Sequence, residues 1–173
     1  MSRFPVLAVW ASALLLAACS PTFNWRAIRV EPTGLVSMLP CKPDKGARQV
    51  PMAGREVELS VTGCDTGGAT FAVLHADIGD PGRTAEVLGQ WKQATLANMR
   101  VAAGREQAFV PPGALNLPQS LQVVASGQRA DASKVESHAA YFARGSRVFQ
   151  AVIYADRLEP GVADTFFSGL KFE

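Results

Sequence analysis

The sequence predicts an α+β fold in which an antiparallel β-sheet is sandwiched by helices. Residues 56–62 alternate between apolar and polar side chains, which is typical of a strand with one face in water. Residues 80–104 instead carry apolar side chains at helical spacing. Gly145-Ser146 separates two apolar runs and indicates a β-hairpin. Strands come in groups rather than in strict alternation with helices, and this favours α+β architecture.

The first third of the domain is expected to consist of short strands and turns. Residues 25–30 have strand character, 31–34 form a turn, and 35–39 form a strand that ends at Pro40. Residues 42–54 are polar and contain two prolines and two glycines, so we expect a loop there. The alternating strand at 56–62, a turn at 65–68 and a strand at 69–76 follow.

The longest helix is predicted to begin at Asp80-Pro81, because Asp is a good N-cap and Pro suits the first helical position. Gly104 marks its end. The residues that recur on its apolar face are Val87, Leu88, Trp91, Thr95 and Met99.

The C-terminal part is predicted to hold a central hairpin. Residues 110–118 contain three prolines and a glycine and must be irregular, whereas 121–126 and 135–143 read as strands. A two-residue loop at Gly145-Ser146 pairs Arg144 with Arg147 and Phe142 with Phe149. Further along, Ala140 pairs with Ala151 and His138 with Ile153, and Tyr141, Val148, Val152 and Tyr154 lie on the other face. A short helix from Pro160, ended by Gly169, and a strand at 170–172 complete the chain.

The N-terminal nineteen residues combine a basic start, a short apolar run and a cysteine. A membrane-spanning helix needs about 20 apolar residues, and the run here is roughly half that length. A buried core helix is the other structural alternative, but Arg3 and the small-residue exit favour a secretory signal. Leu16-Ala17-Ala18-Cys19 resembles the lipobox of bacterial lipoproteins. An ordinary cleaved signal remains the alternative.

The lipobox resemblance implies an address and an anchor. In that family the chain is cut before the cysteine, and Cys19 would carry acyl chains such as palmitate on its sulfur and its new amine. Several chains hold a protein on a membrane far more firmly than one. Ser20 stands where an inner-membrane retention signal would have Asp, so the periplasmic face of the outer membrane is expected. The expected organisation is a signal peptide at 1–18, a lipidated tether at 19–24 and a single domain at 25–173.

Cysteine usage agrees with export. Apart from Cys19 the chain has Cys41 and Cys64, and two cysteines in an oxidising compartment are expected to pair. Two free buried thiols are the alternative. No C-x-x-C motif is present in the sequence, so the predicted bridge is a structural staple rather than a redox centre.

The charge pattern argues against nucleic-acid binding. The 17 basic and 15 acidic residues nearly balance, and no block of like charge occurs in the sequence. The isoelectric point near 8.6 therefore reflects near-neutrality rather than a basic patch.

Several segments follow one another in the order seen in PsbP-like domains. They are 35–43 (LVSMLPCKP), 69–73 (ATFAV), 147–152 (RVFQAV) and 166–172 (FFSGLKF). The resemblance implies an antiparallel sheet between helices and a non-catalytic accessory or binding role beside an envelope complex. It supplies no site residues, and Cys41 departs from the pattern.

Candidate ligand residues are few. His75, Asp77 and Asp80 could bind a metal ion, but Asp80 suits a helix cap and His75 ends a core-facing stripe, so a structural histidine is favoured. His138 is expected on the Phe142 face of the hairpin. A small-ligand or metal site formed by His75, Asp77 and His138 is the alternative to protein binding.

The sequence lacks the G-x-S-x-G, H-E-x-x-H, phosphate-loop and EF-hand motifs, and no enzyme activity or cofactor is expected. The proline-rich loop at 111–118 is the candidate surface for an envelope protein partner. Trp25 either rests at the lipid headgroups or packs against the first strand, with packing favoured.

Overall fold

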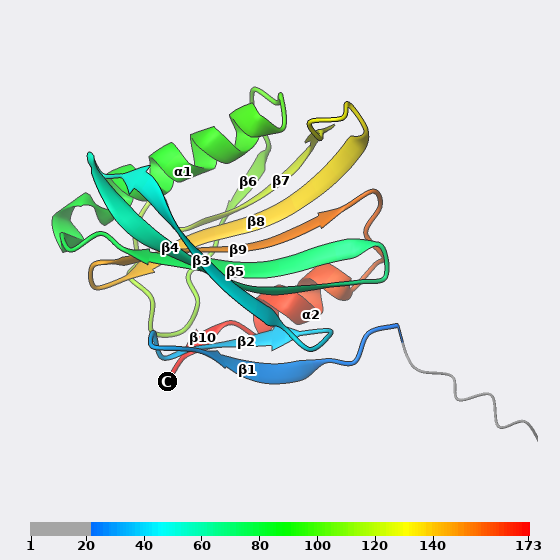
Figure 1. Ribbon diagram of the computed structural model, residues 1–173, viewed down its shortest axis with the longest axis horizontal. Coiled ribbons are helices and arrows are strands. Elements are labelled where there is room, and N and C mark those ends of the chain that lie inside the picture. Colours follow the sequence, from blue (N-terminus) through cyan, green and yellow to red (C-terminus); the bar gives the residue numbers. More distant parts are fainter. Residues whose placement is uncertain (1–21) are drawn as a thin grey trace, which may run out of the picture.

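Two antiparallel sheets and two helices make up the fold (Figure 1). The computed structural model describes residues 22–173. A three-stranded sheet has the order β1-β2-β10, and a seven-stranded sheet has the order β3-β4-β5-β9-β8-β7-β6. The strands are β1 (Arg26–Val30), β2 (Leu35–Leu39), β3 (Asp44–Met52), β4 (Arg55–Thr66), β5 (Ala69–Asp77), β6 (Arg105–Ala108), β7 (Leu121–Gln128), β8 (Lys134–Arg144), β9 (Arg147–Ala155) and β10 (Lys171–Phe172), and the helices are α1 (Thr84–Asn98) and α2 (Val162–Ser168).

The large sheet is assembled from two meanders. Strands β3, β4 and β5 follow one another from one edge to the middle. The chain then crosses one face as α1, enters the opposite edge as β6 and returns through β7 and β8 to β9. Strand β9 pairs with β5, so the two meanders meet in the centre of the sheet.

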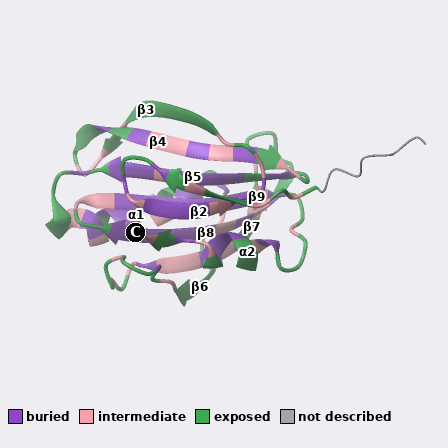
Figure 2. Ribbon diagram, turned by 90° about the horizontal axis from the view of Figure 1, so that it is seen from below, coloured by how far each residue is buried: buried purple, intermediate pink, exposed green. Residues whose placement is uncertain are grey.

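Helices cover both faces of the large sheet, as the sequence predicts, but the second cover is shared with the small sheet. Helix α1 lies on one face, whereas α2 and the strands β1, β2 and β10 lie on the other (Figure 1). The central strands are buried on both sides and the edge strand β3 is exposed (Figure 2). The molecule is therefore a mixed fold of α-helices and antiparallel sheets with two separate apolar cores.

Aromatic rings fill the core between the large sheet and α2. Phe142 of β8 and Phe149 of β9 stack in parallel with ring centroids 5.2 Å apart. Phe71 of β5 meets Phe166 of α2 edge to face at 5.7 Å. All four side chains are fully buried, and offset or edge-on aromatic contacts of this kind add to the stabilisation from area burial.

Trp25 belongs to this core rather than to an exposed surface. Its ring meets Phe71 edge to face at 5.9 Å and stacks on Phe23 at 6.0 Å. Trp25 therefore packs within the domain, with Phe71 of β5 and Phe23 as its aromatic partners, where the sequence predicted packing against the first strand.

The β8–β9 hairpin has the register expected from its two-residue turn. Arg144 pairs with Arg147 and Phe142 with Phe149. His138 is opposite Ile153, four residues further along the ladder. Gly145 has a φ of 59°, a left-handed conformation that glycine adopts at little cost. A local turn signal thus sets the alignment of the two central strands.

Three expectations about secondary structure need correction. The loop expected at 42–54 is in fact the edge strand β3, and β6 was not expected at all. Nearly every residue of both strands is exposed. Neither strand therefore has the alternation of apolar and polar side chains that indicates a half-buried strand. The predicted helix start at Pro81 is a 3₁₀ turn capped by Asp80, whose Oδ1 accepts from Gly82 N at 2.9 Å, and the α-helix begins at Thr84.

No helix among residues 22–173 is both long and apolar enough to cross a membrane. The expected signal peptide and Cys19 lie outside the described residues.

Candidate ligand-binding pocket

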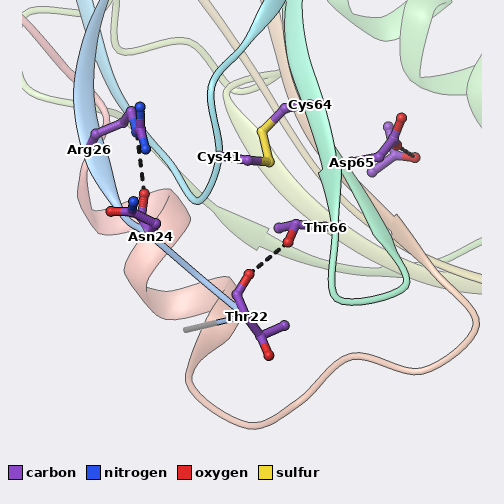
Figure 3. The surroundings of a disulfide bond; sticks show 8 residues. Thr22, Asn24, Arg26, Cys41, Cys64, Asp65 and Thr66 are labelled. Carbon is purple, nitrogen blue, oxygen red and sulfur yellow. Dashed lines mark hydrogen bonds between the residues drawn. A yellow bond between two sulfur atoms is a disulfide. The ribbon is translucent and has the colours of Figure 1, made fainter. Parts of the chain in front are cut away.

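Cys41 and Cys64 form a disulfide, with their Cα atoms 6.0 Å apart (Figure 3). Cys41 follows β2 of the small sheet and Cys64 lies in β4 of the large one. The predicted pairing is therefore present, and the bridge links the two sheets. Close to it, Thr66 Oγ1 donates to Thr22 O at 2.7 Å and fixes the start of the fold (Figure 3).

The structure does not bring the two histidines together. His75 lies opposite Phe149 in the sheet and His138 lies opposite Ile153, with β9 between their strands. Four residues along the strands and two strand spacings place them about 16 Å apart. One metal ion cannot bind both, and residues 22–173 contain no group of three His, Cys, Asp or Glu side chains that could hold a metal.

His75 is a buried core residue, 6% exposed, whose ring lies 5.9 Å from that of Phe149. Burial lowers the pKa of His75, the positive charge of Arg147 lowers it further, and Glu58 acts in the opposite direction. The imidazole is therefore held neutral. This environment matches the structural reading of His75.

Asp77 and His138 each have a local partner. Asp77 Oδ1 accepts from Ser146 Oγ at 2.7 Å and from Gly79 N at 2.9 Å, and these bonds lower the pKa of Asp77. His138 Nε2 lies 2.5 Å from Glu136 Oε1 in the same strand. The sequence-predicted ligand residues thus serve separate local contacts in the part of the chain that the structure describes.

A pocket of about 530 Å³ opens instead between α1 and the large sheet. Its volume falls in the range typical of small-molecule sites, roughly 300–1,000 Å³. The residues that line it come from seven elements and the β7–β8 turn: Arg48, Leu59, Val61, Thr70, Ala72, Leu74, Trp91, Thr95, Asn98, Met99, Gln128, Arg129, Val135, Gln150, Val152 and Tyr154.

The pocket exists because α1 crosses the sheet diagonally. At the helix start, Arg83 Nη1 donates to Ala53 O in the β3–β4 turn at 2.6 Å. At the helix end, Gln128 N of β7 donates to Met99 O at 2.9 Å. The helix therefore begins over one end of the sheet near β3 and ends over the other near β7, and it leaves the corner of β4, β5 and β9 uncovered.

Small and half-buried side chains shape the floor of this corner. Ala72 of β5 adds little volume, while Val61 and Leu74 are only half-buried despite facing α1. Trp91 of the helix and Tyr154 of β9 also line the pocket and are half-buried. These apolar surfaces remain available to a ligand.

A polar network lies at the deep side of the pocket. Gln150, only 3% exposed, donates from Nε2 to Thr95 Oγ1 at 3.0 Å and to Tyr141 OH at 3.1 Å. Thr95 in turn donates to Trp91 O at 3.0 Å, which fixes its hydroxyl. The two bonds use both amide protons of Gln150, so any further partner must donate to its amide oxygen.

Burial also shifts the pKa values of the two tyrosines in this region. It raises the pKa of Tyr154 to about 12 and raises that of Tyr141 as well. Both phenols are therefore neutral hydrogen-bonding groups at physiological pH. Neither has the lowered pKa that a nucleophile or base would need.

Positive charge, without negative charge, lines the pocket. Arg48 projects from β3 on the α1 side of the sheet, since it pairs with the buried Leu59. Arg129 Nη1 is already engaged with Asp156 Oδ1 and Lys134 O, both at 2.6 Å. No Asp or Glu is among the lining residues, although Asp65 Oδ1 accepts from the lining Thr70 Oγ1 at the pocket edge. The positive charge that remains lies on the Arg48 side of the pocket, and that side favours an anion.

No family model, curated protein or solved structure matches this chain. No motif in the sequence indicates this pocket. Its lining residues fit ordinary strand and helix positions in the sequence. Trp91 and Met99 were predicted on the apolar face of the helix, and in the structure Trp91 is half-buried and Met99 is buried.

The proline-rich loop at 111–118 is held on the domain at two points. Leu115 N donates to Ala143 O at 2.7 Å, and Phe172 N donates to Pro112 O at 2.9 Å. Val110 and Leu115 are 41% and 37% exposed, the two large hydrophobic residues most open to solvent among those described. The loop presents apolar side chains at the Ala143 end of β8. This is the opposite end of the large sheet from Thr66 and Thr22.

Proposed function

We propose that this chain is a lipid-anchored envelope protein that binds a small ligand, without catalysis, in the pocket between α1 and the large sheet. The observation that carries the proposal is the set of half-buried apolar side chains, Val61, Leu74, Trp91 and Tyr154, around a cavity of ligand size. Water contact with these surfaces is costly, and a ligand that covered them would recover that free energy.

The lipid anchor rests on the lipobox-like Leu16-Ala17-Ala18-Cys19. Cleavage before Cys19 and acylation, with palmitate among the chains, would place the domain on the outer membrane facing the periplasm. The hydrogen bond of Thr22 O with Thr66 Oγ1 means that the fold begins three residues after Cys19, a span of at most about 11 Å. The Cys41–Cys64 disulfide fits an oxidising compartment.

The chemistry of the lining residues supports binding rather than catalysis. A hydrolase or transferase needs a nucleophile, a base and an orienting group within hydrogen-bond reach. The pocket is lined by apolar, amide, hydroxyl and guanidinium groups, with no His, Cys, Asp or Glu among them. We further propose that the fold is PsbP-like, which the antiparallel sheet between helices supports.

The anchor is tested by the intact mass of protein extracted from membranes, with and without reduction and alkylation. The expected mass is that of residues 19–173 plus acyl chains. Two cysteines should react with the alkylating reagent only after reduction. A mass equal to the uncleaved or unacylated chain would overturn the anchor and leave the pocket proposal standing.

The pocket is tested with 1-octanol as a neutral apolar probe. Mature protein in zwitterionic lipid nanodiscs should show a rise in Tm when the probe is added, because a ligand that binds only the folded state stabilises it. Thr70 lies exposed at the pocket edge, and Thr70→Phe should fill the pocket and abolish the rise. Partition of the probe into lipid is the same for both proteins and cancels in the comparison. Equal shifts for both proteins would overturn the proposal.

A second candidate function is docking of an envelope protein at the 111–118 loop. Leu115 within the loop and Val110 just before it are both exposed, and exposed apolar side chains suit a protein interface. Crosslinking in intact cells should capture a specific protein with the wild-type chain and lose it with Val110→Ser/Leu115→Ser. Retention by the double variant would contradict this surface.

A further inference from the structure

We infer that the ligand of the α1 pocket is an amphipathic anion whose acidic group meets Arg48 while its hydrocarbon part covers the apolar floor. This inference deepens the proposed function and rests on the pocket being a ligand site. It concerns the class of ligand and the residue that selects it.

The first support is the charge of the pocket. Arg48 takes part in none of the seven ion pairs found among residues 22–173. Arg129, the other cation of the pocket, is committed to Asp156. Arg48 is therefore the guanidinium that remains available, and a guanidinium binds carboxylate and phosphate oxygens in a bidentate manner.

The second support is the order of polar and apolar groups across the pocket. Arg48 stands on the edge strand β3, and the floor from Val61 to Leu74 leads inward to the buried amide of Gln150. A ligand that spans this distance meets positive charge at one end and apolar surface along its length. An anion with a hydrocarbon chain or ring has the same order of groups.

The third support is position, and it depends on the proposed acylation of Cys19. Thr70 at the pocket edge pairs with Asp65, next to Thr66, which bonds the backbone of Thr22. The pocket therefore lies at the end of the sheet where Thr66 bonds Thr22, the first residue that the structure describes. Amphipathic anions concentrate in membranes, so a site at this end of the domain would lie near their source.

The experiment compares three probes with the same eight-carbon tail: octanoate, octyl phosphate and 1-octanol. Mature protein in zwitterionic nanodiscs is titrated with each probe, and the apparent Kd is taken from the Tm shift. We expect octanoate or octyl phosphate to bind about tenfold more tightly than 1-octanol. This is the gain expected from one solvent-exposed, charge-assisted hydrogen-bond contact between Arg48 and the acidic group.

Two variants assign this preference to Arg48. Arg48→Gln should weaken binding of the anions about tenfold and leave 1-octanol unchanged. Lys45→Gln is the matched control. It removes one positive charge from the same strand, but Lys45 faces the other side of the sheet. It should change neither affinity.

The outcomes separate the inference from the proposed function. If 1-octanol binds as tightly as the anions, or if Arg48→Gln and Lys45→Gln behave alike, the anion inference is overturned while the pocket stands. If none of the three probes binds, the pocket proposal itself fails. A preference of octyl phosphate over octanoate, or the reverse, identifies the acidic group within the inferred class.

Discussion

Cys41 and Cys64 join the small sheet to the large one across 23 positions of sequence. Cys41 follows β2 and Cys64 lies in β4, so the bridge closes a loop that contains β3. The other links between the two sheets are non-covalent: side chains of the aromatic core, and a hydrogen bond from Arg147 Nη1 of β9 to Pro32 O in the β1–β2 turn at 3.1 Å. This covalent link is the basis of the first prediction.

Removal of the disulfide should lower the free energy of unfolding by about 3.5 kcal/mol, because the bridge restricts the unfolded chain. The measurement is chemical denaturation of the wild type and of Cys41→Ala/Cys64→Ala. The double variant should be insensitive to reductant, while the wild type should lose a similar amount when reduced. A wild type whose stability is the same in both conditions would contradict the prediction.

Gly127 sits where α1 meets β7, and a side chain there has no room. A Cβ on Gly127 would collide with Met99 O and with Val101 Cγ2. Gly127→Ala should therefore destabilise the fold by about 1–3 kcal/mol, the usual cost of overpacking. Thermal denaturation measures the loss.

The matched control for this substitution is Gly89→Ala. Gly89 lies within α1, and a Cβ there would meet nothing within 4 Å. The better helix propensity of Ala should stabilise the protein by up to about 1 kcal/mol. If both substitutions shift Tm in the same direction, the close contact between Met99 and Gly127 does not control stability.

His75 should make the protein less stable in mild acid. Its folded-state pKa is lowered below 6.5, so on acidification the unfolded chain takes up a proton before the folded chain does. The free energy of unfolding should be highest above that value, fall as the pH drops below 6.5 and level off below the folded-state pKa. Denaturation curves recorded at intervals from about pH 7.5 to about pH 4.5 test this slope.

The control replaces the titrating group. His75→Gln removes the imidazole, and the slope just below pH 6.5 should shrink even if the overall stability changes. Asp77, with a lowered pKa below 3.8, contributes only at more acidic pH. A slope that persists unchanged in His75→Gln would assign the effect to another group.

The two tyrosines of the chain should resist ionisation in the folded protein. Both lie in or beside the pocket wall, and burial raises the pKa of Tyr154 to about 12 and raises that of Tyr141. Phenolate absorbance of the native protein should therefore stay low as the pH passes 10, whereas denatured protein titrates near 10. Stability should be intact below pH 10 and fall as the pH rises toward 12, because the unfolded state loses its protons first.

Tyr154→Phe assigns the phenol that titrates near 12. The variant should lose that step in the native titration and keep the second one. A native phenol that ionises near pH 10 in the wild type would show that the wall of the pocket is open to water.

Local signals explain which elements could be predicted. The turn Gly145-Ser146 and the apolar runs on both sides fix the β8–β9 register, because a two-residue turn leaves a single alignment. His75 was expected in the core from its position after Phe71 and Val73, and it is buried. Strands β3 and β6 escaped notice because their stability comes from backbone pairing at an edge, which leaves no apolar pattern.

The sequence by itself determined the central hairpin, the packing face of α1 and the pairing of two cysteines, since each depends on periodicity, turn chemistry or composition. Only the tertiary structure decided that the disulfide joins two sheets, that His75 and His138 are far apart and that α1 crosses the sheet diagonally. Contacts between Arg83 and Ala53 and between Gln128 and Met99 set that diagonal. The pocket is the space that this crossing leaves uncovered. The placement of a helix on a sheet depends on contacts between residues far apart in the chain, so no local sequence pattern indicates it.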